Sequence, residues 1–258
     1  MTLLNRQTLK NYFKKGSFPT EMHFSHLIDS MINIVDDGIG RGVDEGFRIS
    51  PLGFSKRLIS FFGSYKDKQP SWHISLNDND VDGLSFQEGD QGVRLSLRKG
   101  GNVGINTLNP VHTLEVKGTC GFETRTGTFK KGKVPGDGKW HNIISGLDQV
   151  QAFEVMAQIN GRPSSGKYAI SHALALSTFG GRMSKWKVRN TAAYYGGFFN
   201  RLQFRWDGSV HHYALQVRTR THYGLNDRNG EPYFIQYNIT RLWNPEEIDQ
   251  NDASAVIL

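Results

Sequence analysis

The sequence predicts a mainly β protein with an N-terminal amphipathic helix, a small β module and a C-terminal antiparallel β-sandwich. Three observations support this: an apolar stripe with helical spacing near the N-terminus, short strand-like runs separated by Gly, Asn and Asp, and a later hairpin that alternates between apolar and basic residues. The expected boundaries are 1–46 for the helical segment, 47–128 for the β module and 129–258 for the sandwich.

Composition indicates a folded protein rich in turns. The 258 residues include 29 glycines, and 12% of the chain is aromatic, unlike a disordered protein. The single cysteine, Cys120, excludes an internal disulfide. No apolar run reaches the roughly 20 residues of a membrane span, and the N-terminus lacks the apolar core of a secretory signal. We therefore expect a protein made in the cytoplasm, without a signal peptide or membrane span.

The helical stripe lies between Thr20 with Glu21, which are typical of a helix start, and Gly38, which is typical of a helix end. A shorter helix is expected at 5–15. Because no second long helix is near, the stripe must be covered by the β domain or by other copies of the chain, and we favour an oligomer. The residues expected at the oligomer contact are Phe24, Leu27, Ile28, Met31, Ile32 and Val35.

The β module contains one candidate cation site. Six strands are expected, at 57–64, 71–77, 83–89, 93–101, 102–106 and 112–118. Between the second and third, Asp78, Asp80 and Asp82 precede Gly83 with the alternating carboxylates of a calcium loop. The twelfth position is Gly89 where a bidentate Glu is needed, so a solvated turn is favoured over calcium binding.

The C-terminal part begins with an expected linker and turn at 130–140. If Asp207 and Gly208 form a two-residue turn, residues whose numbers add up to 415 lie opposite each other in a hairpin. One face of this hairpin is then apolar and the other is basic. The predicted partner-binding residues on the basic face are Arg201, Gln203, Arg205, His212, Gln216, Arg218 and Arg220. Lys185, Lys187 and Arg189 are expected to join them.

The charge of this part indicates an anionic partner. Between residues 161 and 224 there are ten Lys or Arg residues and one acid, Asp207. Guanidinium rows suit phosphate, sulfate or carboxylate groups, and an anionic surface glycan or an acidic protein is the partner expected for them. An ordinary solvated face or a subunit interface is slightly favoured over such binding. Nucleic acid is less expected, because the aromatic side chains point inward and cannot stack on bases.

No motif predicts catalysis. Residues 161–168, GRPSSGKY, match the core of a phosphate-binding loop, but Tyr168 replaces the Ser or Thr that binds magnesium, and a strand follows instead of a helix. A hairpin loop is favoured there. Neither a nucleophile elbow nor an H-E-x-x-H motif is present. We expect no catalytic residue, no metal site and no cofactor.

Residues 98–119, RKGGNVGINTLNPVHTLEVKGT, resemble a segment common in phage tail-fibre and related adhesin proteins, with Asn106 in place of a usual glycine. The run FPTEMHFSHLIDSMIN is similar to a helix near the start of many tail and fibre proteins. Beyond residue 126, the blocks DGKWHNIISGLDQVQAFEVMAQINGRP and YALQVRTRTHYG look like the C-terminal domain of small fibre-like components of contractile injection systems.

The resemblance implies a non-enzymatic, homo-oligomeric and trimeric structural or attachment protein of a phage-tail-like particle. Such a protein is a tail fibre or an adaptor at the baseplate or cap, and it binds a receptor or other particle proteins. The helix would anchor it, the fibre-like β module would be a spacer, and the sandwich would bind the partner. A glycan-binding, lectin-like or glycan-cleaving β-sandwich protein is the alternative.

Overall fold

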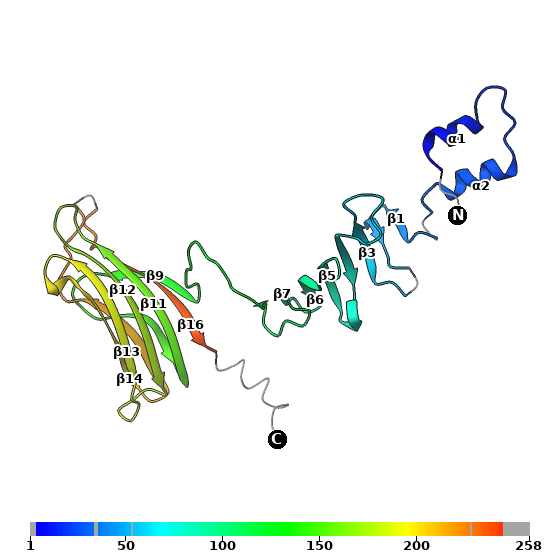
Figure 1. The fold of residues 1–258 in the computed structure, drawn as a ribbon. Helices are drawn as coiled ribbons and strands as arrows, with labels where there is room; N and C mark the ends of the chain where they lie inside the picture. The colour runs from blue at the N-terminus through cyan, green and yellow to red at the C-terminus, as the bar shows by residue number, and fades with distance from the viewer. Residues whose placement is uncertain (1–3, 34–35, 53, 228, 245–258) are drawn as a thin grey trace, which may run out of the picture. The chain divides into compact units, whose positions relative to one another are not determined.

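The structure is a computed structural model that describes residues 4–33, 36–52, 54–227 and 229–244 (Figure 1). Among the described residues, 46% are in strands and 9% in helices, so the protein is mainly β, as predicted. The chain divides into two compact units, Met1–Gly121 and Phe122–Leu258, which we call the N-terminal and C-terminal units. Within the described residues, no helix has the length and apolar character needed to cross a membrane.

Two short helices begin the described chain, α1 (Arg6–Tyr12) and α2 (Glu21–Asp29) (Figure 1). The α2 helix begins directly after Thr20, as predicted, but it is shorter than the predicted stripe. The Ser30 hydroxyl donates a hydrogen bond to the backbone oxygen of His26 at 2.7 Å, which competes with the helical hydrogen bonds at this end. Met31 and Ile32 therefore follow the helix, and the predicted contact residue Val35 lies outside the described residues.

The two helices contact each other through their aromatic side chains. The Tyr12 and His23 rings stack with centroids 3.9 Å apart, and the Phe13 and Phe24 rings meet edge to face at 5.6 Å. This contact covers only part of the predicted stripe. Among its other described members, Leu27 is half-buried, and Ile28, Met31 and Ile32 are exposed, with exposed fractions of 61%, 55% and 73%.

The N-terminal unit also contains a two-stranded hairpin, β1 (Ile39–Gly42) and β2 (Gly46–Ile49), and a six-stranded sheet. The six strands follow one another in chain order, and all pair antiparallel except the last two, which are parallel. Each strand lies within a predicted run. They are β3 (Arg57–Phe61), β4 (Trp72–Leu76), β5 (Gly83–Glu88), β6 (Val93–Arg98), β7 (Val103–Ile105) and β8 (Leu114–Val116).

The segment that resembles tail fibres forms β7, a turn with the buried Pro110, and β8. Asn106, which replaces the usual glycine, has a φ of 57°. Asparagine adopts this left-handed conformation more readily than other residues with a side chain, so the substitution keeps the turn. Gly104 is required for a different reason: a Cβ there would lie 2.5 Å from both the Ser96 hydroxyl and the Thr107 oxygen.

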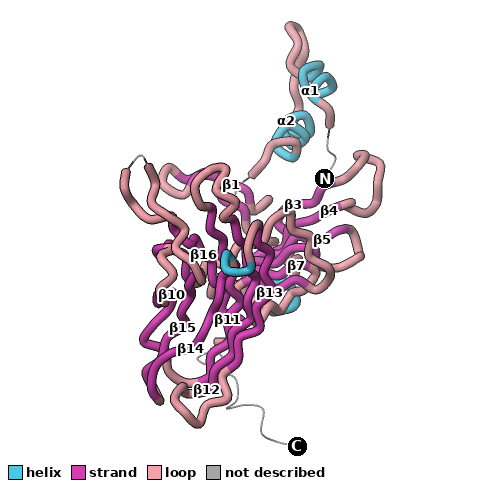
Figure 2. The backbone as a smooth tube through the Cα atoms, turned by 90° about the vertical axis from the view of Figure 1, so that its left-hand side faces the viewer, coloured by secondary structure: helices cyan, strands magenta, loops and turns pink. Residues whose placement is uncertain are grey.

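The C-terminal unit contains a five-stranded sheet in the order β13-β12-β11-β16-β9 and a three-stranded sheet in the order β10-β15-β14. Strands of both sheets are labelled in Figure 2. All pairs are antiparallel. The strands are β9 (Lys130–Pro135), β10 (His141–Leu147), β11 (Val150–Asn160), β12 (Tyr168–Thr178), β13 (Lys187–Tyr195), β14 (Leu202–Ser209), β15 (His212–Thr219) and β16 (Phe234–Trp243).

One hydrophobic cluster joins the two sheets of the C-terminal unit. Phe153, Val155 and Ile159 of β11 contribute from the five-stranded sheet, and Leu215 and Val217 of β15 contribute from the three-stranded sheet. All five have exposed fractions of at most 1%. Every second residue of β11 from Phe153 to Ile159 and of β15 from Tyr213 to Val217 belongs to this cluster, so the alternate residues of these strands lie on the outer faces of the two sheets.

Two predictions for this unit are wrong. The expected linker at 130–140 contains β9, which pairs with β16 at the edge of the five-stranded sheet, where Lys, Gly and Pro are tolerated. The hairpin turn is at Val210 and His211 instead of Asp207 and Gly208, so opposite residues of β14 and β15 add up to 421 and not 415. His211 has a φ of 61°, and its backbone N–H donates to the Phe179 oxygen at 2.8 Å, so contacts outside the hairpin hold the turn.

Candidate functional site

The predicted basic face is the outer face of the β14–β15 hairpin. The register error leaves this assignment unchanged, because 415 and 421 are both odd and each pairs odd-numbered with even-numbered residues. Gln203 lies opposite Arg218 and Arg205 opposite Gln216. Both arginine Nε atoms donate to the glutamines, Arg205 to Gln216 at 2.8 Å and Arg218 to Gln203 at 3.1 Å. The hairpin therefore holds two guanidinium groups in place.

Aromatic rings complete this surface, which we call the arginine face. The guanidinium carbons of Arg205 and Arg218 lie 4.4 Å and 4.3 Å from the ring centre of Trp140. The Arg201 guanidinium lies 4.0 Å from the Phe198 ring, and that of Arg220 4.9 Å from the Phe199 ring. Among the described residues, Arg205 alone of the four has a carboxylate within ion-pair distance, Asp207 at 3.7 Å. The face can therefore take an external anion.

Hydrogen bonds order the loops at the two ends of the arginine face. Partial burial raises the pKa of Asp137. The hydrogen bonds from the His141 ring, at 2.7 Å, and from the Lys139 backbone lower this pKa by more than burial raises it, so the net shift is downward. The pKa of Asp148 is also lowered, by the Gln149 backbone N–H and by the His211 ring. Both carboxylates therefore stay ionised in mildly acidic solution.

The structure does not bring all the predicted basic residues together. Lys187 and Arg189 lie on β13 and pair with Leu176 and Leu174 of β12, on the outer face of the five-stranded sheet. The arginine face belongs to the three-stranded sheet. His212, at the end of β15, is exposed opposite Ser209. The predicted single basic surface is therefore two surfaces on different sheets.

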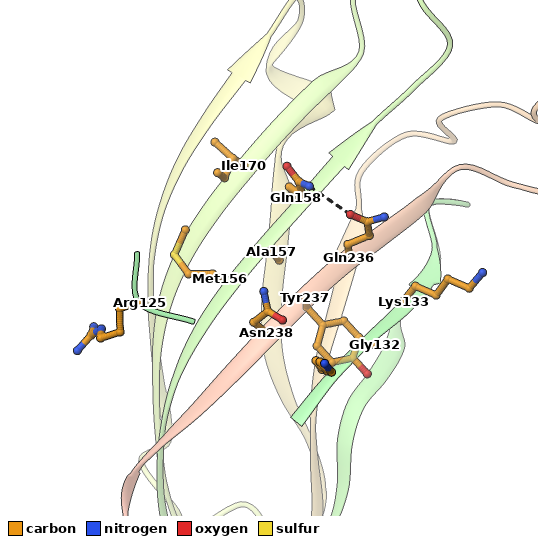
Figure 3. A pocket seen from close by; sticks show the side chains of 11 residues that line it. Arg125, Gly132, Lys133, Met156, Ala157, Gln158, Ile170, Gln236, Tyr237 and Asn238 are labelled. Atoms are coloured by element: carbon orange, nitrogen blue, oxygen red, sulfur yellow. Dashed lines mark hydrogen bonds between the residues drawn. The ribbon is translucent and has the colours of Figure 1, made fainter. Parts of the chain in front are cut away.

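The outer face of the five-stranded sheet contains a groove of about 570 Å³ that the sequence analysis missed (Figure 3). Strand pairing produces one row of side chains in the order Ile170, Gln158, Gln236 and Lys133. Gln158 donates to Gln236 at 3.2 Å within this row. A neighbouring row runs through Met156, Asn238 and Lys131. Each row thus changes from apolar to amide to cationic across the sheet.

A carboxylate lies beside the groove and is held by a guanidinium group and an imidazole ring. Glu154, whose side chain is 14% exposed, accepts from Arg125 Nη2 at 2.9 Å and 2.8 Å and from the His172 ring at 2.9 Å. Both carboxylate oxygens of Glu154 are engaged, so it fixes Arg125 at the end of the groove. Among the described strand residues of this outer face, Glu154 is the one acid, compared with Lys131, Lys133, Lys187 and Arg189.

The six-stranded sheet of the N-terminal unit has one covered and one open face. The covered face is polar: His73, Ser75, Ser85 and Ser96 are 4%, 2%, 2% and 1% exposed, and the Ser96 hydroxyl donates to the Thr107 oxygen at 2.7 Å. The open face is apolar, and we call it the apolar sheet face. Strand pairing produces two rows on it, Ile59, Ile74, Phe86, Leu95, Ile105 and Val116, and Leu76, Leu84, Leu97, Val103 and Leu114. None of these eleven is buried.

The three aspartates of the candidate calcium loop have different partners. Asp78 accepts a hydrogen bond from the Gln87 amide, Asp80 lies 3.9 Å from the Lys56 ammonium, and Asp82 lies 3.7 Å from that of Lys99. The described residues contain no group of three His, Cys, Asp or Glu side chains that could hold a metal ion. The GRPSSGKY segment is the loop of the β11–β12 hairpin, as favoured.

Comparison with known proteins gives no relative: no family model matches the chain, and no curated protein matches it.

Proposed function

We propose that the protein is a non-enzymatic, homo-oligomeric attachment or structural component of a phage-tail-like particle, a fibre or an adaptor at the baseplate or cap, with three copies. In this proposal the N-terminal unit holds the copies together. The C-terminal unit is a β-sandwich that presents the arginine face to an anionic partner, which is a receptor or another particle protein.

The apolar sheet face carries the proposal. Its two rows include Ile59, Leu97 and Leu114, which are 37%, 39% and 63% exposed. Patches of this kind on single chains mark association sites. The polar face of the same sheet is already covered, so further burial must come at the apolar side. A second and a third copy of the chain would supply matching surfaces.

The exposed helical stripe supports the same conclusion. Leu27 is half-buried, whereas Phe24, Ile28, Met31 and Ile32 are exposed. Both apolar surfaces are in the N-terminal unit, which resembles fibre modules in sequence. The C-terminal unit has its own core and stays free to bind other molecules.

The mass of the full chain in solution tests the proposal. Light scattering behind gel filtration should give three times 29.1 kDa, and the protein should sediment with the sheath and tube of a particle when these are coexpressed. A monomer at micromolar concentration that does not bind to such a particle would refute it. A dimer or larger closed ring would retain the association and refute the copy number.

A further inference from the structure

We infer that the groove on the outer face of the five-stranded sheet is a binding site for a polysaccharide segment that carries carboxylate groups. This inference rests on the proposed attachment function for the role it gives such a sugar, but its geometry is independent of oligomer formation. It also differs from the predicted site, because the arginine face is on the other sheet of the unit.

The groove offers the three kinds of contact that an acidic sugar requires. Met156 and Ile170 are 40% and 46% exposed and provide an apolar surface for the C–H face of a pyranose ring. The amides of Gln158, Gln236 and Asn238 line the middle of the groove (Figure 3). Amide side chains both donate and accept hydrogen bonds, as sugar hydroxyl groups do.

Two lysines at one side of the groove favour an acidic sugar over a neutral one. Lys131 and Lys133 lie on β9 on the same side as the amides, and no described carboxylate lies within ion-pair distance of either ammonium. The Lys133 ammonium is 4.5 Å from the ring centre of Phe234, which holds its position without neutralising its charge. A carboxylate bound here would gain charge-assisted hydrogen bonds.

The shape of the groove is fixed by the strands. Its lining comes from β9, β11, β12 and β16 together with Arg125, whose guanidinium is fixed by Glu154. Sites on paired strands are more precisely positioned than sites on loops, so the groove is formed before the ligand binds.

The test is titration calorimetry of the full chain with hexasaccharides of hyaluronate, galacturonate and alginate, with maltohexaose as the neutral probe. We expect saturable binding of at least one uronate, weaker at high salt, and none of maltohexaose. The double variant Lys131→Gln with Lys133→Gln should weaken uronate binding about tenfold or more. Circular dichroism should show that this variant stays folded, because both side chains are exposed on an edge strand.

Two control variants remove equal charge elsewhere. Lys187→Gln with Arg189→Gln changes the same sheet face outside the groove lining, and Arg218→Gln with Arg220→Gln changes the arginine face; neither should alter uronate affinity by more than about twofold. Failure of all three uronates to bind overturns the inference, as does loss of binding only in the Arg218 and Arg220 variant. The solution mass is read separately: a trimer that binds no uronate overturns this inference alone, and a monomer that binds overturns the proposed oligomer alone.

Discussion

The two units of this chain bury opposite kinds of side chain. In the C-terminal unit, the buried faces of two sheets share one apolar cluster, and Phe153, Leu215 and Ile235 have no exposed surface. In the six-stranded sheet of the N-terminal unit, serines and a histidine are buried while the aliphatic residues face outward. The C-terminal unit therefore has an apolar core of its own, whereas the six-stranded sheet leaves its apolar side open, and the proposed function assigns the covering of that side to other copies of the chain.

The largest expected effect comes from removing a core side chain of the C-terminal unit. Phe153→Ala should lower the free energy of unfolding of this unit by about 3–5 kcal/mol, because it leaves a cavity among residues that cannot collapse into it. Urea unfolding of the variant measures this loss. The loss should not change with protein concentration, and a clear dependence on concentration would show that the C-terminal unit also relies on other copies.

The second prediction concerns the apolar sheet face. Phe86→Asp places a charge in the middle of its first row, so we expect the trimer to dissociate while the C-terminal unit keeps its thermal transition. Light scattering and calorimetry measure the two effects. Leu174→Asp is the matched control, since Leu174 is 39% exposed on the outer sheet face of the other unit and should leave the mass unchanged. A trimeric Phe86→Asp variant would contradict the assigned role of this face.

The helical stripe should make a smaller contribution. Leu27→Asp or Met31→Asp is expected to weaken assembly and leave the C-terminal unit folded, because an apolar contact between copies would have to bury a charge. The expected result in gel filtration is a mixture of sizes that shifts with dilution. If the elution volume equals that of the unchanged protein at all concentrations, the stripe has no part in assembly.

The short strands could be predicted from sequence because turn residues bound each of them. The sheet face on which each hairpin residue lies could also be predicted, since it depends only on whether the residue number is odd or even. The exact register was not, because the β14–β15 turn is fixed by Phe179 and Asp148, which are remote in sequence. Contacts of this kind override the local preference of an Asp-Gly pair for turns.

The groove was missed for a related reason. Its lining residues are apart in sequence, and only the order β12-β11-β16-β9 makes neighbours of Ile170, Gln158, Gln236 and Lys133. One signal was available: over residues 173–176 of β12 both alternate sets are nonpolar, with Ala173 and Ala175 inside and Leu174 and Leu176 outside. An apolar outer face on a central strand indicates a surface that contacts something else.

Mildly acidic pH should lower the stability of the N-terminal unit and leave that of the C-terminal unit unchanged. Burial, and then the charge of Arg57, lower the pKa of His73 below its ordinary 6.5. The unfolded chain then gains a proton below about pH 6.5 before the folded chain does, so stability present above that pH is lost as the pH falls to the folded pKa. The lowered pKa values of Asp137 and Asp148 act on the C-terminal unit only below their ordinary 3.8.

Hydrogen exchange followed by mass spectrometry measures this difference. Between pH 7 and pH 5, after correction for the intrinsic pH dependence of exchange, protection should fall in peptides from β4 to β6 and stay constant in peptides from β11 and β12. His73→Gln should remove the dependence, because glutamine does not titrate. Equal loss of protection in both units would contradict the assignment to His73.

The smallest expected effect on the fold belongs to the arginine face. Arg218→Gln with Arg220→Gln should leave the unfolding transition within about 0.5 kcal/mol, because surface substitutions of this kind are usually near neutral. Affinity for the anionic partner should fall and depend less on salt, since two of four guanidinium groups are lost. Titration of the partner between 50 and 500 mM salt, roughly spanning screening lengths from 14 to 4 Å, measures both effects. An unchanged affinity would assign the face to solvent and leave the groove as the binding surface of this unit.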